Sequence, residues 1–238
     1  MISKILLLLA PLIYGVAMFR VSAFQTRRRL RRQSTALTDP RLQGLNARLA
    51  TAAGIPAITT SIYEVATVNG LTTPEGDVYL TRGLFECYRR GEISAEEMTS
   101  VTAHELGHVA LGHGKRRLTV FAGQNAARML LGFMLGRFIP FIGPRIADGL
   151  TSLLVSRISR DDEYAADKYA SALLIRAGLG TEIQKSMLQS LEHMTGHSGG
   201  MVAWLMSHPP IPKRIAAIEK NERRWRSPDD TELAGLLG

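Results

Sequence analysis

The sequence predicts an α+β fold that is predominantly helical, with one small sheet and a single transmembrane helix at the N-terminus. Residues 5–24 form a long apolar run, β-branched residues gather only between residues 57 and 81, and the flanking segments carry helical patterns and caps. At 238 residues the chain has room for one well-buried domain and an appendage. We expect a membrane anchor over residues 1–25, a basic linker over 26–37, a folded domain over 38–222 and a loosely ordered tail over 223–238.

The N-terminal run is long enough to cross a bilayer. Residues 5–19 contain no charge, and the run reaches 20 residues at Phe24 if the side chain of Arg20 extends to the lipid interface. The arginine cluster at residues 27–32 follows, and such clusters stay on the cytoplasmic side. This predicts a single-pass protein of the cell (inner) membrane with its folded domain in the cytoplasm. A cleaved signal peptide is the alternative, with 21–23 as cleavage site, but its positive charge lies on the wrong side of the apolar run.

The distribution of charge argues against a nucleic-acid partner. The net charge is +8, and residues 1–32 contain seven Lys and Arg and no acid, so the remaining 206 residues sum to only +1. A nucleic-acid-binding domain would spread its basic residues over a folded face. We therefore disfavour a membrane-tethered module that binds nucleic acid or lipid as the main function.

The folded domain opens with a helix and then a strand-rich stretch. Thr38-Asp39-Pro40 is typical of a helix start, and Gly54 with Pro56 ends the helix. Residues 57–68 are rich in β-branched types and predict one strand, Gly76 predicts a turn, and residues 78–81 predict a second strand.

Two later helices carry the polar motifs. Ser94 and Glu97 have the spacing of a capping box, so a helix begins there, runs through His108 and ends near Gly112. A second helix is expected over residues 151–177, with Gly178 as its stop.

Residues 104–108 read HELGH, the HExxH pattern. Residues four apart on a helix share a face, so His104 and His108 can reach one cation. Neutral imidazole is a good ligand for Zn²⁺, and a catalytic zinc keeps one position for water. Glu105 would lie beside the metal and act as the general base. Two solvated histidines on a surface helix are the alternative, which the capped helix start and the apolar positions Val101 and Leu111 make less favourable.

A third ligand can be sought further along the chain. A third histidine ten positions after His104 is excluded because that position is Gly114, and we interpret His113 as a structural or capping residue. Glu163 and Asp167 lie four apart on the second helix, where a carboxylate can ligate and the next can orient a zinc histidine. The alternative is a solvated acidic face paired with neighbouring Arg157, Arg160 and Lys168.

Taken together, these motifs resemble the zinc metallopeptidase family of the heat-shock protease HtpX and the CAAX prenyl endoprotease. The resemblance covers roughly residues 38–220. It includes Val68-Asn69-Gly70 before a short strand, the HELGH core followed by His113, Ser159-Arg160 before the Glu163 segment, and Ser207-His208-Pro209-Pro210 followed by Arg214.

The resemblance implies a gluzincin-type zinc metallopeptidase domain, with one Zn²⁺ per chain held by His104, His108 and Glu163 and with Glu105 as the catalytic base. It implies that Asp167 and Arg214 support the ligands. It also implies that His208 stabilises the oxyanion of the tetrahedral intermediate across the cleft, and that an extended substrate binds at the sheet edge near Asn69.

Two features depart from the family. Gly70 stands where an alanine is usual. HtpX carries further membrane spans between its metal motifs, whereas residues 118–142 here are apolar but interrupted by Arg128 and Arg137. We expect a pair of amphipathic helices that covers the cleft or lies against the bilayer, and membrane insertion of this stretch stays open.

The expected function is a membrane-anchored zinc metalloendopeptidase in the turnover of membrane or misfolded proteins, with polypeptide and lipid bilayer as partners. A non-catalytic, zinc-stabilised membrane scaffold or chaperone is the alternative, but it would have no need of Glu105. The single cysteine, Cys87, excludes an internal disulfide and is expected to be an inert, half-buried thiol.

Overall fold

The computed structural model describes residues 2–73, 75–139, 142–195 and 209–225 of the chain. It divides into two compact units: unit 1 comprises residues 1–31 and 112–161, and unit 2 comprises residues 32–111 and 162–238. The expected tail beyond residue 225 and the motif residues Ser207 and His208 lie outside the described residues.

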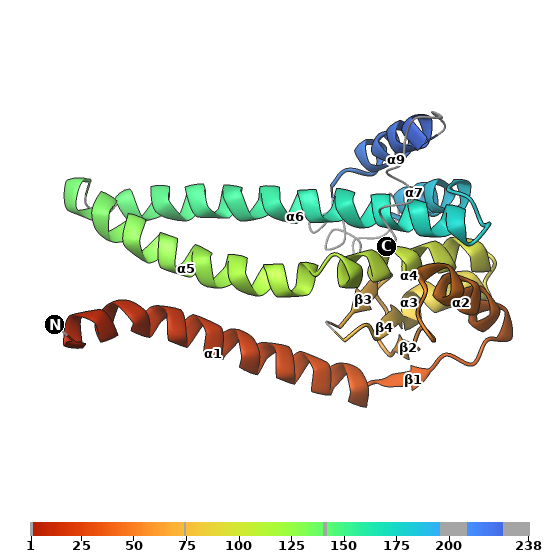
Figure 1. Cartoon of the computed structure of the whole chain (residues 1–238), viewed down its shortest axis with the longest axis horizontal. Coiled ribbons are helices and arrows are strands. Elements are labelled where there is room, and N and C mark those ends of the chain that lie inside the picture. The colour runs from red at the N-terminus through yellow and green to blue at the C-terminus, as the bar shows by residue number, and fades with distance from the viewer. Residues whose placement is uncertain (1, 74, 140–141, 196–208, 226–238) are drawn as a thin grey trace. The chain divides into compact units, whose positions relative to one another are not determined.

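Helices make up most of the described chain (Figure 1). They are α1 (Ile2–Arg32), α2 (Pro40–Ala53), α3 (Arg82–Arg89), α4 (Ala95–Ala110), α5 (His113–Phe138), α6 (Gly143–Arg176), α7 (Glu182–Thr195) and α9 (Ile211–Trp225). The strands are β1 (Ser34–Ala36), β2 (Thr60–Tyr63), β3 (Gly70–Thr72) and β4 (Val78–Thr81). A predominantly helical α+β fold is confirmed.

Unit 1 consists of α1, α5 and the first part of α6. Helices α5 and α6 run side by side in opposite directions (Figure 1), and Arg128 of α5 forms an ion pair with Asp148 of α6. The stretch 118–142 therefore contributes most of one helix, and its antiparallel partner begins at Gly143. Over the described residues, no helix combines the length and apolar composition needed to cross a membrane.

The charge of the chain divides sharply between the two units. Unit 1 contains 14 Lys and Arg and two Asp, a net charge of +12, whereas unit 2 contains 15 Lys and Arg and 19 Asp and Glu, a net charge of −4. Basic charge is thus not confined to residues 1–32, because α5 and α6 add to it in the same unit. The segment expected as a basic linker, 26–37, contains the end of α1 and all of β1.

The four strands among the described residues of unit 2 form one mixed sheet in the order β1-β2-β4-β3. Strand β2 pairs with β4 in parallel, while β1 and β3 pair in antiparallel fashion with β2 and β4, so β3 is an edge strand. The single strand expected over residues 57–68 is wrong in extent. Only Thr60–Tyr63 pairs, since the chain turns immediately after Tyr63, where Val65 N donates to the Tyr63 carbonyl.

Local signals at helix ends and at the β3–β4 turn act as expected. Asp39 accepts a hydrogen bond from Leu42 N and caps α2, and Gly54 ends the helix at φ 69°. Ser94 and Glu97 form the complete capping box of α4. Gly76, at φ 97°, lies in the turn between β3 and β4.

Helix α4 lies at the centre of unit 2, in contact with α2, α3, α7, β3 and β4. Its buried side chains Met98, Ala103 and Leu106 join leucines of α2, β4 and α6 in one core. Leu111, expected on the buried stripe, is 40% exposed because it already lies at the C-cap of the helix. A helix so enclosed holds its polar face in a fixed position, which sets up the site described next.

Candidate metal centre

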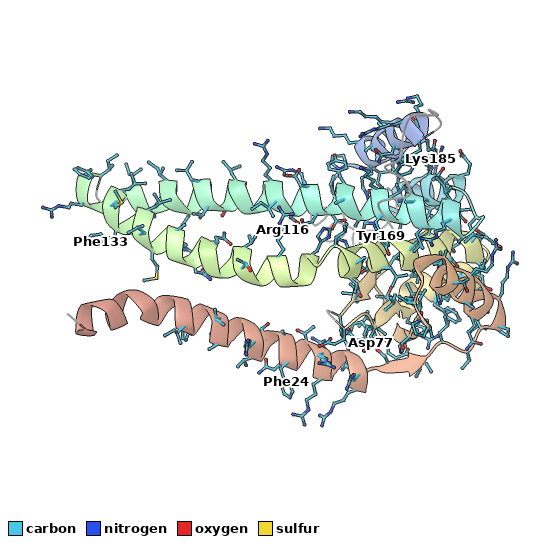
Figure 2. The ribbon with its side chains drawn as sticks, viewed as in Figure 1. Phe24, Asp77, Arg116, Phe133, Tyr169 and Lys185 are labelled. Carbon is cyan, nitrogen blue, oxygen red and sulfur yellow. The ribbon has the colours of Figure 1, made fainter. Side chains whose placement is uncertain are left out.

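Two helices of unit 2 bring the polar motifs together. His104 and His108 lie one turn apart on α4, and Glu163 and Asp167 lie one turn apart on the part of α6 that belongs to the same unit. Glu163 and Asp167 are 2% and 1% exposed, so the alternative of a solvated acidic face is wrong for these two residues. Tyr169, which Figure 2 labels on α6, belongs to the core on the same stretch of helix.

Three ligand-type side chains converge on one point. The Nε2 atoms of His104 and His108 are 3.2 Å apart, and each lies 3.4 Å from one carboxylate oxygen of Glu163. All three ligand atoms lie within 4.8 Å of one another, and among the described residues this is the group of His, Cys, Asp and Glu that could hold a metal ion. His113 is not part of it.

The tautomer of His104 follows from its neighbour. Its Nδ1 lies 3.0 Å from Asp167 Oδ1, and an ionised carboxylate only accepts, so Nδ1 donates, which leaves Nε2 as the nitrogen that can ligate a cation. Burial alone would lower the pKa of His104, but its hydrogen bonds to Asp167 and Glu163 raise the pKa to about 9. The two carboxylates that favour a proton on this ring would equally favour a metal cation at Nε2.

Asp167 is itself fixed by a buried network. Burial would raise the pKa of its carboxyl, but Arg214 and His104 lower it, so it is ionised. Arg214 of α9 donates to both carboxylate oxygens, at 2.7 and 2.6 Å. Gln184 of α7 donates a hydrogen bond to the Asp167 carbonyl. The Ser171 hydroxyl contacts the same carbonyl and the side-chain oxygen of Gln184. Removing one partner from a buried ion pair costs about 3–5 kcal/mol in proteins, so this pair holds α9 against the site.

Gly107 lets α4 approach α6 closely. A Cβ at this position would lie 2.9 Å from the Ala166 carbonyl oxygen and 3.0 Å from the Ala166 Cα. Both contacts are with backbone, which cannot yield as a flexible side chain can. The glycine of the HELGH motif is therefore what keeps the histidines of one helix within reach of Glu163 on the other.

We predict that Gly107→Ala destabilises unit 2 by about 1–3 kcal/mol, because the added methyl overpacks two helix backbones. It should also weaken metal binding, because α4 moves away from Glu163. The matched control is Gly44→Ala in α2, where a Cβ would meet nothing within 4 Å and where helix propensity predicts a gain of about 0.5–1 kcal/mol. Denaturant unfolding and zinc titration measure both; equal effects of the two variants would contradict this role of Gly107.

Glu105 lies in a pocket next to the three convergent side chains. It is 7% exposed, and the pocket is also lined by His104, Asn69 and Gly70. A Cβ at Gly70 would lie 3.0 Å from Glu105 Oε1 and 2.8 Å from the Val101 side chain. The glycine that departs from the family pattern thus allows the edge strand β3 to pass directly over Glu105.

Asn69 has a structural task that the sequence did not reveal. Its side-chain oxygen accepts a hydrogen bond from Gly70 N, and its backbone exchanges hydrogen bonds with Thr81. It therefore fixes the start of β3 while it lines the pocket. A role in substrate binding stays a prediction.

Other expected residues fall away from the centre or outside the described chain. Cys87 is 3% exposed, more buried than expected, and burial raises the pKa of its thiol, as fits an inert residue. His208 lies outside the described residues, so its role stays a prediction. Gln184 and Ser171 were missed because no local motif marks them; they matter only through contacts between helices.

The donor set fits a zinc ion. Two imidazole nitrogens and one carboxylate are the ligands that catalytic zinc sites use, with a further position left for water. The hydrogen bond from His104 Nδ1 to Asp167 is the support such ligands need, because it fixes the ring and raises its basicity.

Comparison with known proteins agrees with this geometry. Metalloprotease YcaL of Escherichia coli (strain K12) is 28% identical over 158 residues, covering 66% of this chain and 59% of YcaL. Metalloprotease LoiP of the same strain is 29% identical over 162 residues, covering 66% and 60%. Protease HtpX of Shewanella sp. (strain W3-18-1) is 30% identical over 209 residues, covering 73% and 71%. The chain spans about three fifths of the length of the two Escherichia coli relatives.

The sequence profile of Peptidase family M48 matches residues 36–222, which include every residue of the candidate centre. The match covers most of the chain and confirms the resemblance to HtpX-like metallopeptidases. The protein belongs to Peptidase family M48.

Proposed function

We propose that the protein is a zinc-dependent metalloendopeptidase that cuts polypeptides by attack of water on the peptide bond. The observation that carries the proposal is the convergence of His104, His108 and Glu163 beside a pocket that contains Glu105. Its relatives YcaL and LoiP bear the name metalloprotease, which supports the same assignment.

In this proposal His104, His108 and Glu163 hold one Zn²⁺ per chain. The ion supplies a Lewis acid and lowers the pKa of water. Asp167 keeps the His104 lone pair directed to the centre, and Arg214 keeps Asp167 ionised and in place. Glu105 takes a proton from the attacking water and passes it to the leaving amine. His208 would stabilise the oxyanion, as the family resemblance implies.

The edge strand β3 offers a place for the substrate backbone. It pairs with β4 on one side, and Asn69 and Gly70 place it beside Glu105. An extended polypeptide that adds to this edge would have its backbone aligned by hydrogen bonds, whatever its sequence. This suits an endopeptidase that acts on misfolded or membrane-associated chains.

Metal reconstitution tests the proposal. The purified protein should hydrolyse casein, lose this activity when zinc is removed with a chelator, and recover it when about one equivalent of Zn²⁺ per chain is restored. Zinc content is measured by atomic emission on the same samples. Full activity in the metal-free protein would refute the proposal, and tight zinc binding without hydrolysis would favour the scaffold alternative.

We propose further that unit 1 attaches the enzyme to a membrane. The apolar run of residues 5–24, the net charge of +12 and the exposed apolar side chains of α5 and α6 support this. Phe133, labelled near the far end of α5 in Figure 2, is 76% exposed, and Phe138 is 79% exposed. Arg128 is paired with Asp148, which reduces the cost of bringing its charge near lipid.

Fractionation tests this attachment. The full chain should stay in the inner membrane after alkaline extraction, and protease added to spheroplasts should leave the domain intact, as a cytoplasmic location requires. A photo-crosslinking residue at Phe133 should label lipid, whereas the same residue at Ile55, an exposed apolar position of unit 2, should not. Digestion from outside would overturn the orientation, and a mature N-terminus after residue 23 would identify a signal peptide.

A further inference from the structure

The pocket beside Glu105 has a predominantly apolar lining that the proposed chemistry does not use. Its apolar side chains come from three helices, α3, α4 and α7, and from the loop before β3: Val68, Leu84, Val101, Met187, Leu188 and Leu191. All of them, like Glu105, belong to unit 2. A pocket of this composition next to a catalytic group is suited to one side chain of a bound polypeptide.

Four polar residues of the same lining, Ser100, Asp167, Gln184 and Arg214, already have hydrogen-bond partners within the fold. Ser100 donates to the Glu97 carbonyl at 2.6 Å. Gln184 donates to Asp167 and accepts from Ser171. Arg214 and Asp167 form their bidentate pair, so their charges cancel. A charged side chain that entered would lose its hydration, and a cationic one would have to pair with Glu105, which the proposed chemistry needs as the base.

One helix supplies most of the wall opposite α4. Gln184, Met187, Leu188 and Leu191 are spaced by three or four residues or adjacent, so they form one face of α7. Glu97 fixes the distance between the helices, because its Oε1 accepts hydrogen bonds from Ser186 at 2.6 Å and Ser190 at 3.2 Å. The width of the pocket is thus set by α7 side chains on a helix that cannot easily shift.

We infer that this pocket receives the side chain of the substrate residue that supplies the leaving amine, that it selects uncharged apolar side chains, and that Met187 and Leu191 set the size accepted. The inference rests on the proposed function. Glu105 passes its proton to the leaving nitrogen, so the residue that carries this nitrogen is the one nearest to the pocket that Glu105 lines.

A peptide series tests the inference. The peptides differ only in the residue after the scissile bond, which is Leu, Phe, Asp or Lys, and mass spectrometry locates each cut. Wild type should cleave before Leu with kcat/KM at least about tenfold higher than before Asp or Lys. Met187→Ala and Leu191→Ala should each raise the ratio of kcat/KM for the Phe peptide to kcat/KM for the Leu peptide by about tenfold, since the removed atoms leave room for a ring.

The ratio of the kcat/KM values of two substrates, measured on one variant, does not depend on how much of that variant is folded. The control is Leu174→Ala, a fully buried core residue of α6 that does not line the pocket; it should lower the yield and leave the ratio unchanged. Equal cleavage before Leu and Lys, or Phe to Leu ratios in the Met187 and Leu191 variants equal to that of wild type, would overturn the inference.

Binding separates this inference from the proposed function. Fluorescent peptides of the same series are titrated into zinc-loaded Glu105→Gln, and anisotropy gives each Kd. The Leu peptide should bind at least about tenfold more tightly than the Lys peptide. Selective binding to Glu105→Gln, together with no cleavage by wild type, would refute the proposed function and support the pocket assignment. Equal binding of the Leu and Lys peptides would refute the pocket assignment.

Discussion

Replacing Glu105 by Gln should lower kcat for peptide hydrolysis by about 10²–10⁴-fold, the usual contribution of a general base. The amide has the shape of the carboxylate but cannot take a proton from water. Glu105 is 7% exposed and follows a ligand-type histidine without joining the convergent group, so the metal should be retained at one equivalent per chain. Steady-state kinetics on a fluorogenic peptide and zinc analysis of the same preparation measure both quantities.

Two controls make this result specific. Glu92→Gln removes a carboxylate between α3 and α4 that pairs with Arg90, the C-cap residue of α3. Neither residue lines the pocket, so this variant should leave kcat unchanged. Circular dichroism of Glu105→Gln should match wild type. Hydrolysis retained in Glu105→Gln would remove this residue from the role of base.

Replacing Glu163 by Ala should abolish stoichiometric zinc binding. Loss of a group that merely supports a ligand weakens metal affinity by about 10–100-fold, and loss of a ligand should cost at least as much. The variant would also leave the two Nε2 atoms, 3.2 Å apart, without their anionic neighbour. Competition with a zinc-binding dye measures the affinity.

Asp161→Ala is the matched control, because Asp161 is an exposed carboxylate two positions earlier in the chain. It should bind zinc like wild type. A thermal scan adds a second readout: chelation should lower the Tm of wild type and Asp161→Ala, since a metal that binds only the folded state stabilises it, and it should not change that of Glu163→Ala. Zinc at full occupancy in Glu163→Ala would mean that the third ligand lies elsewhere.

Local signals made the helices of the site predictable. Ser94 and Glu97 define the start of α4, and the spacing of His104 and His108 follows from helix geometry alone. The spacing of Glu163 and Asp167 indicated one helix face, but only the structure decides that the face is buried against α4 and not solvated.

Contacts between distant segments were not predictable in the same way. The parallel pairing of β2 with β4 and the short strand β1 depend on how the sheet is assembled, not on local propensity. Gln184 carries no motif, and its bond to Asp167 exists because α7 packs beside α6. The motif alone gives no reason for a glycine at position 107. The reason is the Ala166 carbonyl oxygen, which would lie 2.9 Å from a Cβ at this position.

X-ray absorption at the zinc edge tests the central claim most directly. We expect one zinc per chain with only nitrogen and oxygen ligands at about 2.0–2.2 Å, and the outer-shell scattering of two imidazoles, for His104 and His108. The oxygen contribution should fall in Glu163→Ala reconstituted with excess metal. A sulfur ligand at about 2.3 Å, fewer than two imidazoles, or a spectrum that Glu163→Ala leaves unchanged would contradict a zinc centre built from His104, His108 and Glu163.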